Sequence, residues 1–359
     1  MKKILITGAG GFVGSRILQQ WQGKYELCAL PKGFFCTADE ALTRAQVEAL
    51  HPDVILHTAA LSDTSYCAQH PAEAYRANVE LPVWLARAAQ QTKAKLVAFS
   101  SDQVYAGVQQ QGPLPETLAL HPANIYGQYK LEAEQRVLEL CPDSVHLRAS
   151  WMYDLPGYGL PIRGNLPLNL LRAALKGEAL RFSRNDHRGV TYVRQVIENL
   201  EPAMALPGGV YNFGSGNAEN MVCTARQFAE TLGIAVQIEE ESWGRNLVMD
   251  TTKLERFGIR FDTTQQGIQR CLKDYGLRTL YNFHIAQKSN KTKQKSRSSA
   301  RNSSDQSGKN AQSALLFVFL SGKQPFTKKS YLIYKDTQFC YNKSAFLVKQ
   351  SKRMIFVKI

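Results

Sequence analysis

The order of hydrophobic and polar positions divides the chain into three parts. In residues 1–150, short apolar or β-branched runs alternate with longer segments of helical spacing. This alternation predicts strands at 3–7, 26–30, 54–58, 95–100 and 144–148, and helices at 15–20, 43–50, 72–91 and 128–140. Because strands separated by helical crossovers are typical of βαβ units, we predict an α/β domain with a doubly wound parallel sheet in this part.

The pattern changes twice in the rest of the chain. Residues 151–276 contain more Pro- and Gly-rich loops, with helices predicted near 167–175, 224–232 and 264–275, and we predict a smaller substrate-binding lobe there. Residues 277–359 are predicted to be a basic low-complexity tail. Within it, the stretch 287–312 is rich in Lys, Ser, Asn and Gln and cannot bury enough apolar surface to offset its ordering entropy, so we expect disorder.

The charge of the chain is concentrated in this tail. The sequence has 44 Lys and Arg against 30 Asp and Glu, a net charge of +14 that suggests a polyanionic partner. Residues 278–359 hold 17 of the bases and two of the acids, which leaves 27 bases and 28 acids in residues 1–277. The body is therefore near neutral. Since no nucleic-acid-binding motif accompanies the basic tail, we predict no specific nucleic-acid partner.

Cysteine usage and hydropathy bear on the compartment. The seven cysteines are scattered and form no Cys-x-x-Cys pair, which favours reduced thiols of a cytoplasmic protein and argues against a disulfide framework or a metal site. The longest apolar run, 314–320, is much shorter than the ~20 residues of a membrane span. The N-terminal apolar run ends at Thr7 and Gly8, too early for a signal peptide. We predict no membrane association.

A glycine-rich turn follows the first predicted strand directly. Residues 7–14 read TGAGGFVG and lead into a helical segment. Glycines at this spacing allow a tight turn, a close approach of a pyrophosphate to the backbone, and close packing of helix on strand. The N-terminus of the helix then offers free N–H groups to the phosphates. We predict a Rossmann-type dinucleotide site that includes Gly8, Gly10, Gly11, Phe12, Val13 and Gly14.

The second predicted strand bears on the choice of dinucleotide. It ends at Leu30, Pro31 and Lys32, where NAD enzymes usually carry an acidic residue for the ribose. Lys32 and Arg16 are candidates to bind a 2′-phosphate, and the alternative for each is an ordinary surface charge. NADP(H) is favoured, and NAD(H) stays open.

A tyrosine and a lysine suggest proton-transfer chemistry. Tyr126 and Lys130 are four residues apart in a predicted helix and therefore share one face. An ammonium near the phenol would lower its pKa and let it exchange a proton with a substrate oxygen. Ser101 follows the strand 95–100, at the edge where doubly wound sheets bind ligands. We predict Ser101, Tyr126 and Lys130 to be catalytic.

Together these features resemble the extended short-chain dehydrogenase/reductase superfamily, and within it the sugar-nucleotide reductases typified by dTDP-4-dehydrorhamnose reductase. The resemblance covers about residues 1–275. Besides the glycine turn, it rests on Ala59 and Ala60 after the third strand and on the stretches RASWMY (148–153), GN (164–165) and DHRGVTY (186–192). It implies an oxidoreductase of carbohydrate biosynthesis that uses NAD(P)H to reduce a nucleotide-linked 4-keto-6-deoxy sugar.

The resemblance also implies roles for single residues. Tyr126 would donate a proton, Lys130 would orient the ribose and tune Tyr126, and Ser101 would polarise the substrate carbonyl. Ala59 and Ala60 would pass beneath the cofactor. The implied substrate contacts are Asp102, Trp151, Asn165 and Arg188. For Trp151 the alternative is an apolar plug beneath a loop.

Two other functions remain open at this point. One is a sugar-nucleotide epimerase or dehydratase on the same scaffold, which recycles a bound cofactor. The other is a non-catalytic cofactor-binding regulatory subunit, against which the retained Ser101, Tyr126 and Lys130 argue. The branch's acidic pattern after Ala-Ala is replaced here by TSYCA at 64–68, so the particular sugar is also open. The predicted partner is a small sugar nucleotide, and whether the chain forms a homodimer stays open.

Overall fold

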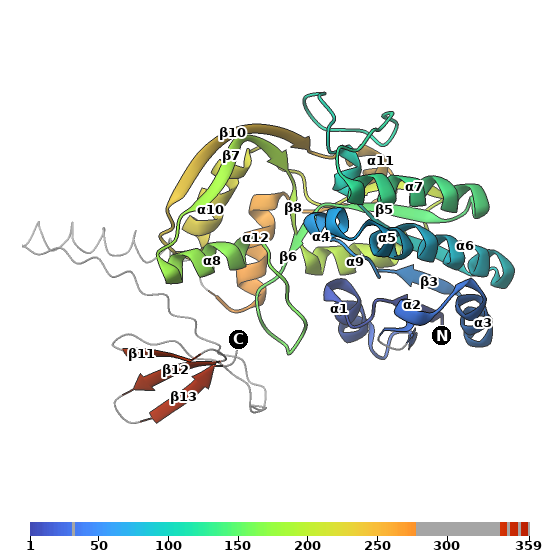
Figure 1. Ribbon diagram of the computed structural model, residues 1–359, viewed down its shortest axis with the longest axis horizontal. Helices are drawn as coiled ribbons and strands as arrows, with labels where there is room; N and C mark the ends of the chain where they lie inside the picture. Colours follow the sequence, from blue (N-terminus) through green and yellow to red (C-terminus); the bar gives the residue numbers. More distant parts are fainter. Residues whose placement is uncertain (31–32, 278–337, 343–344, 351–352, 358–359) are drawn as a thin grey trace, which may run out of the picture.

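A parallel β-sheet organises the first part of the chain (Figure 1). The computed structural model describes residues 1–30, 33–277, 338–342, 345–350 and 353–357. The sheet has six strands in the order β2-β1-β3-β4-β5-β9, and all neighbours are parallel. The strands are β1 (Lys3–Thr7), β2 (Glu26–Ala29), β3 (Val54–His57), β4 (Lys95–Ser101), β5 (Val145–Ala149) and β9 (Gly209–Phe213). The predicted doubly wound α/β fold is confirmed.

Helices cover both faces of this sheet. Ile4 and Ile6 pack on the side of α1 (Phe12–Trp21) and α9 (Val193–Ala203). Leu5, which points to the opposite face, packs with residues of α3 (Glu40–Leu50), α6 (Leu81–Thr92) and α7 (Ile125–Leu140). Because both faces are covered, the central strands are apolar at successive positions rather than alternating. The shorter helices between these elements are α2 (Phe34–Thr37), α4 (Thr64–Gln69), α5 (Pro71–Tyr75), η1 (Arg76–Glu80) and η2 (Asp102–Tyr105).

A second core forms beside the sheet from later parts of the chain. It is built on buried side chains such as Tyr153, Leu170, Phe228 and Ile268. Two pairs of parallel strands contribute to it. They are β6 (Trp151–Tyr153) with β8 (Val190–Tyr192), and β7 (Leu180–Arg188) with β10 (Ile238–Leu247). Its helices are α8 (Leu166–Lys176), α10 (Met221–Leu232) and α12 (Thr264–Asp274), close to the three predicted ranges, and α11 (Thr252–Glu255) lies between β10 and α12.

The boundary predicted at residue 150 does not separate the two cores in space. Helix α9 and strand β9 lie beyond it in the sequence, yet β9 pairs with β5 and α9 packs on the face covered by α1. The chain therefore leaves the sheet after β5 and returns to it. The division into 1–150, 151–276 and 277–359 stays a prediction.

Part of the tail contains regular structure that the sequence did not predict. Strands β11 (Gln338–Asn342), β12 (Ala345–Gln350) and β13 (Arg353–Val357) form an antiparallel sheet. The stretch 287–312, for which we expected disorder, lies outside the described residues. None of the helices in the described ranges is both long and apolar enough to cross a membrane.

The strand order places a topological switch point between β1 and β3. The chain continues from β1 outward to β2, then crosses back to place β3 on the other side of β1. At such a reversal the two flanking loops diverge, and doubly wound sheets bind ligands there, at the carboxyl ends of the strands. Thr7 ends β1, His57 ends β3 and Ser101 ends β4, so the glycine turn and Ser101 lie along the same edge.

Candidate active site

The glycine turn is packed too tightly for side chains at two positions. Gly8 has a φ of 71°, and a Cβ there would lie 2.8 Å from the Ala59 Cα. A Cβ on Gly14 would collide with the Gly8 carbonyl oxygen. These contacts hold the turn, the start of α1 and the segment after β3 against one another. The predicted neighbours Ala59 and Ala60 are therefore placed at the switch point.

The N-terminus of α1 fits a phosphate group. Gly11 is the N-cap, no side chain caps the helix, and its first turn carries no acidic residue. The space beside Gly10 is open, because a Cβ there would meet nothing within 4 Å. Phe12 and Val13 bury their side chains in the core and so present only backbone N–H groups. Exposed N–H groups at a helix N-terminus favour an anion such as the pyrophosphate of a dinucleotide.

Arg16, a candidate for the 2′-phosphate, is bonded to the protein itself. Its side chain is buried, and its Nε donates to Asp154 at 2.7 Å. Its Nη1 donates to the carbonyl oxygens of Phe12 and Pro161, at 2.7 and 2.9 Å. Two of these bonds turn the guanidinium toward the segment after β6. Lys32, the other candidate, lies outside the described residues.

Ser101 and Tyr126 are brought together from two elements. Ser101 ends β4, and Tyr126 lies in the first turn of α7. Gly127 allows this turn to approach η2, since a Cβ there would collide with the Gln103 carbonyl oxygen. Both residues are buried, and the Ser101 side chain acts to lower the pKa of the Tyr126 hydroxyl. The structure thus assembles the hydroxyl pair that the sequence predicted.

Lys130 completes the cluster one helical turn later. Its Nζ lies 5.9 Å from the centroid of the Tyr126 ring and donates to the Phe99 carbonyl oxygen at 3.0 Å. Burial lowers the pKa of Lys130 to about 8, against the opposing charge of Glu134. The ammonium is thus close to the phenol but hydrogen-bonded to the backbone.

The pKa of Tyr126 differs from the sequence-based expectation. We expected Lys130 to lower it, whereas burial raises it above its ordinary value. The Ser101 side chain opposes this rise, and the charge of Asp102 adds to it. A phenol withdrawn from water loses more solvation on ionising than these neighbours return. That prediction is wrong for this structure, in which burial raises the pKa of Tyr126 and so favours the protonated phenol.

A buried ion pair supports the helix that carries Tyr126 and Lys130. Glu134, one turn beyond Lys130, accepts from Nη2 of Arg148 on β5 at 2.7 Å and from the Ser100 hydroxyl at 2.5 Å. Nη1 of Arg148 also donates to the Tyr105 hydroxyl at 2.8 Å. Sequence reasoning used Arg148 only as part of a motif and missed Glu134. The available signal was an acid four residues after Lys130 on the same helix face.

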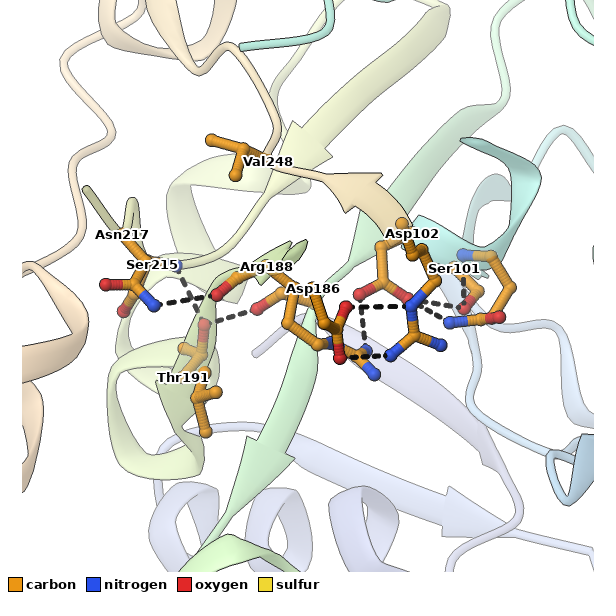
Figure 2. A network of polar contacts seen from close by, with 12 residues as sticks. Ser101, Asp102, Asp186, Arg188, Thr191, Ser215, Asn217 and Val248 are labelled. Atoms are coloured by element: carbon orange, nitrogen blue, oxygen red, sulfur yellow. Dashed lines mark hydrogen bonds and ion pairs between the residues drawn. The ribbon is translucent and has the colours of Figure 1, made fainter. Parts of the chain in front are cut away.

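Three of the predicted substrate contacts, Asp102, Arg188 and Trp151, lie together next to Ser101, and Figure 2 shows the first two. Nη2 of Arg188 and Oδ2 of Asp102 are 2.5 Å apart, and Figure 2 shows the two side chains pointing toward one another. The Arg188 guanidinium carbon lies 5.3 Å from the centroid of the Trp151 ring. Arg188 Nε is buried and has no partner among the described residues. Trp151 is half-buried under this guanidinium.

Asn165, the fourth predicted contact, is engaged by the protein itself. It is fully buried and caps α8, where its Oδ1 accepts from the Leu168 N–H at 3.1 Å. Its Nδ2 donates to the carbonyl oxygens of Asp154 and Arg163, at 3.0 and 3.2 Å. These bonds occupy the amide. The geometry therefore supports a role in shaping the chain, not the predicted substrate contact.

Sequence reasoning missed Arg163, which lies in the same segment. Its Nη1 donates to the Ser62 hydroxyl, just after β3, at 2.6 Å. Leu61, next to Ser62, packs against the apolar cluster that contains Tyr126, and the positive charge of Arg163 acts to lower the pKa of Tyr126. The sequence held only a weak signal, a basic residue directly before the Gly-Asn pair.

Comparison with known proteins decides the family. The sequence model of the RmlD substrate-binding domain family matches residues 1–276. The chain belongs to this family. As a member of this family, the chain is an NAD(P)-dependent oxidoreductase of the extended short-chain dehydrogenase/reductase type, as the motifs predicted.

Relatives of this RmlD-family chain include a polysaccharide biosynthesis protein and a dTDP-4-dehydrorhamnose reductase. It is 27% identical over 281 residues to a spore coat polysaccharide biosynthesis protein of Bacillus subtilis, covering 77% of this chain and 93% of that one. It is 29% identical over 222 residues to a dTDP-4-dehydrorhamnose reductase of Aggregatibacter actinomycetemcomitans, covering 59% and 73%.

Solved structures show the same fold. A dTDP-4-dehydrorhamnose reductase of Bacillus anthracis in complex with NADP has a TM-score of 0.69 at 22% identity, covering 76% of this chain and 99% of that one. A UDP-glucose 4-epimerase of Thermus thermophilus complexed with NAD has a TM-score of 0.61 at 21% identity, covering 74% and 98%. At these identities the likeness concerns the fold alone.

Proposed function

We propose that this chain is an NAD(P)H-dependent reductase of a nucleotide-linked 4-keto-6-deoxy sugar, similar to the dTDP-4-dehydrorhamnose reductases. The observation that carries the proposal is the buried pair of Ser101, at the end of β4, and Tyr126, in the first turn of α7, at the carboxyl edge of the sheet. The pair lies along the same edge as a glycine turn that fits a dinucleotide. Membership of the RmlD family supports this assignment over other hydroxyl chemistry.

NADP(H) is the favoured cofactor, with NAD(H) as the second choice. The N-terminus of α1 and the open space at Gly10 fit the pyrophosphate that both cofactors share. The preference for NADP(H) is supported by the missing acid after β2 and by the NADP complex of the Bacillus anthracis reductase. A bound nicotinamide would supply the hydride.

Proton donation is assigned to Tyr126. Reduction of a ketone adds a hydride to the carbonyl carbon and a proton to its oxygen. Tyr126 is protonated because burial raises its pKa, so it holds this proton until the oxygen becomes basic. The Ser101 hydroxyl, beside the phenol, donates a hydrogen bond to the same oxygen. Lys130 supports the phenolate that forms and relays a proton to it.

The sugar is assigned to the side of the cluster formed by the second core. Arg188, held by Asp102 and lying over Trp151, has a buried Nε without a protein partner in the described ranges. An unpaired buried donor is costly, and a sugar hydroxyl or carbonyl oxygen would satisfy it. We therefore propose Asp102, Trp151 and Arg188 as the substrate-facing set.

The proposal is tested by following cofactor consumption. Purified protein is mixed with dTDP-linked 4-keto-6-deoxy sugar and either NADPH or NADH, and absorbance at the reduced nicotinamide band is compared with product formed. We expect one reduced cofactor consumed per sugar reduced, faster with NADPH. Sugar converted without cofactor loss would identify an epimerase or dehydratase. Cofactor binding without conversion of any 4-keto sugar offered would favour a regulatory subunit.

The pH dependence of the reaction should report Lys130. The pKa of Lys130 in the folded protein is lowered to about 8, so its ammonium is lost as pH rises through that value. We expect kcat/KM, which reports the free enzyme, to fall above about pH 8. Tyr126 stays protonated across this range because its pKa is raised. In Lys130→Arg the charge persists, so the fall should move to higher pH; an unchanged profile would contradict the assignment.

A further inference from the structure

Arg16 links the cofactor helix to the segment that follows β6. We propose that Arg16 is a positioning residue for substrate, which holds residues 154–165 so that Arg163 can bind a phosphate group of the sugar nucleotide. This inference rests on the proposed function and replaces the 2′-phosphate contact that the sequence suggested for Arg16. It names the anionic part of the substrate as the group that Arg163 recognises.

The ion pair of Arg16 with Asp154 is buried. The two side chains are 2% and 8% exposed, and their charged atoms are 2.7 Å apart. The second oxygen of Asp154 accepts from the Leu155 N–H at 3.0 Å and from the Tyr275 hydroxyl at 2.9 Å. Because both partners are buried, removing either one leaves an uncompensated charge. This pair is therefore a rigid attachment point for the start of the segment.

The segment is tied at two further points. Arg16 Nη1 donates to the Pro161 carbonyl oxygen at 2.9 Å. Asn165 bonds the carbonyl oxygens of Asp154 and Arg163 and caps α8. Between these ties the chain turns through Tyr158, which is 65% exposed. The position of Arg163 therefore depends on bonds made from α1 and α8, not on burial of its own side chain.

Arg163 is suited to bind an anion at this place. In the described residues its guanidinium bonds only to the neutral hydroxyl of Ser62 and pairs with no carboxylate. Its charge acts on Tyr126. A guanidinium binds phosphate through a planar fork of N–H groups, and a nucleotide-linked sugar carries a diphosphate. Arg163 would thus anchor the substrate while Tyr126 faces the sugar.

Arg16 lies shortly after the glycine turn on the same helix. The helix whose N-terminus fits the cofactor pyrophosphate thereby also carries the attachment of the substrate segment. A contact to the 2′-phosphate and a positioning role predict different losses when Arg16 is changed. Loss of a 2′-phosphate contact would weaken the binding of NADPH but not of NADH. Loss of a positioning role would weaken the binding of the sugar nucleotide and leave the ratio of the affinities for the two cofactors unchanged.

The experiment compares Arg16→Met, Arg163→Met and the double variant with the wild type. Calorimetric titration gives Kd for NADPH, NADH and dTDP, and turnover gives KM for the sugar nucleotide. In Arg16→Met we expect the ratio of the two cofactor Kd values to change less than about twofold, while the Kd for dTDP rises by about 10-fold or more. Arg163→Met should show the same rise, and the double variant should add little to it, because both act through one contact.

Two outcomes would overturn the proposal. One is a selective loss of NADPH over NADH by about 10-fold in Arg16→Met. The other is additive losses of dTDP binding in the double variant. If Arg16→Met does not fold, as judged by circular dichroism, Asp154→Asn keeps the shape of the partner and must give the same dTDP loss. Should the wild type reduce no sugar, the proposed function fails, but the dTDP and cofactor titrations still decide the role of Arg16.

Discussion

Replacing Tyr126 by Phe is expected to lower kcat by about 10²- to 10⁴-fold, the usual contribution of a positioned general acid. The change removes one oxygen atom from a buried ring whose pKa the Ser101 side chain influences. The ring itself packs with Cys67 and Ala74, and Phe preserves those contacts. Binding of the cofactor should therefore persist, with a Kd for NADPH within about twofold of the wild type.

Tyr129 supplies the matched control. It lies on the same helix and packs edge-on against Tyr75, with ring centroids 5.2 Å apart. Tyr129→Phe makes the same chemical change outside the Ser101 cluster and should leave kcat nearly unchanged. Pre-steady-state measurement of NADPH oxidation would show whether the loss in Tyr126→Phe is in the chemical step. A wild-type rate in Tyr126→Phe would remove Tyr126 from the mechanism.

Replacing Arg148 by Met is expected to lower the free energy of unfolding by about 3–5 kcal/mol. Arg148 and Glu134 are both nearly fully buried, and the substitution leaves the Glu134 carboxylate without its countercharge. It also removes the donor to Tyr105. Because Glu134 lies one turn from Lys130, the loss should loosen α7 and reduce activity as well. Urea unfolding followed by circular dichroism measures the free energy.

A surface pair provides the comparison for this prediction. Arg136 and Glu132 form an ion pair on the same helix with side chains 40% and 37% exposed. Arg136→Met should lower the free energy of unfolding by less than about 1 kcal/mol, since water screens such exposed pairs. Adding Glu134→Leu to Arg148→Met should recover part of the stability, because the orphaned charge is then gone. If Arg148→Met and Arg136→Met lowered the free energy of unfolding equally, the buried pair would not be a main support of α7.

The elements that local patterns specify were predicted well. Strands 3–7, 54–58 and 95–100 are short apolar runs bounded by polar or turn residues, and they form β1, β3 and β4 within a residue of the expected ends. The missed elements depend on distant partners. Strand β9 forms by pairing with β5, and β7 forms by pairing with β10, which are both far away in the sequence. Such pairing cannot be read from the strand's own residues.

The same distinction holds among the site residues. The glycine turn and the Tyr126–Lys130 spacing describe one stretch of chain each, so their local geometry follows from residue type and spacing. Arg16 and Asn165 are different, because their side chains bond to Asp154 and to backbone carbonyls that only folding brings near. For such residues a motif indicates presence at a site but does not distinguish a ligand contact from an internal bond.

The sequence by itself determined the α/β class, the glycine turn at 7–14 and the trio Ser101, Tyr126 and Lys130, because each depends on periodicity or short spacing. It also assigned the excess positive charge to residues 278–359 and not to the enzyme body. Only the tertiary structure decided that burial raises the pKa of Tyr126, that Arg16 pairs with Asp154, and that Arg163 bonds to Ser62. Burial and long-range pairing both arise from the packing of distant segments. Burial shifts the pKa of a side chain, and long-range pairing decides which group the side chain bonds to.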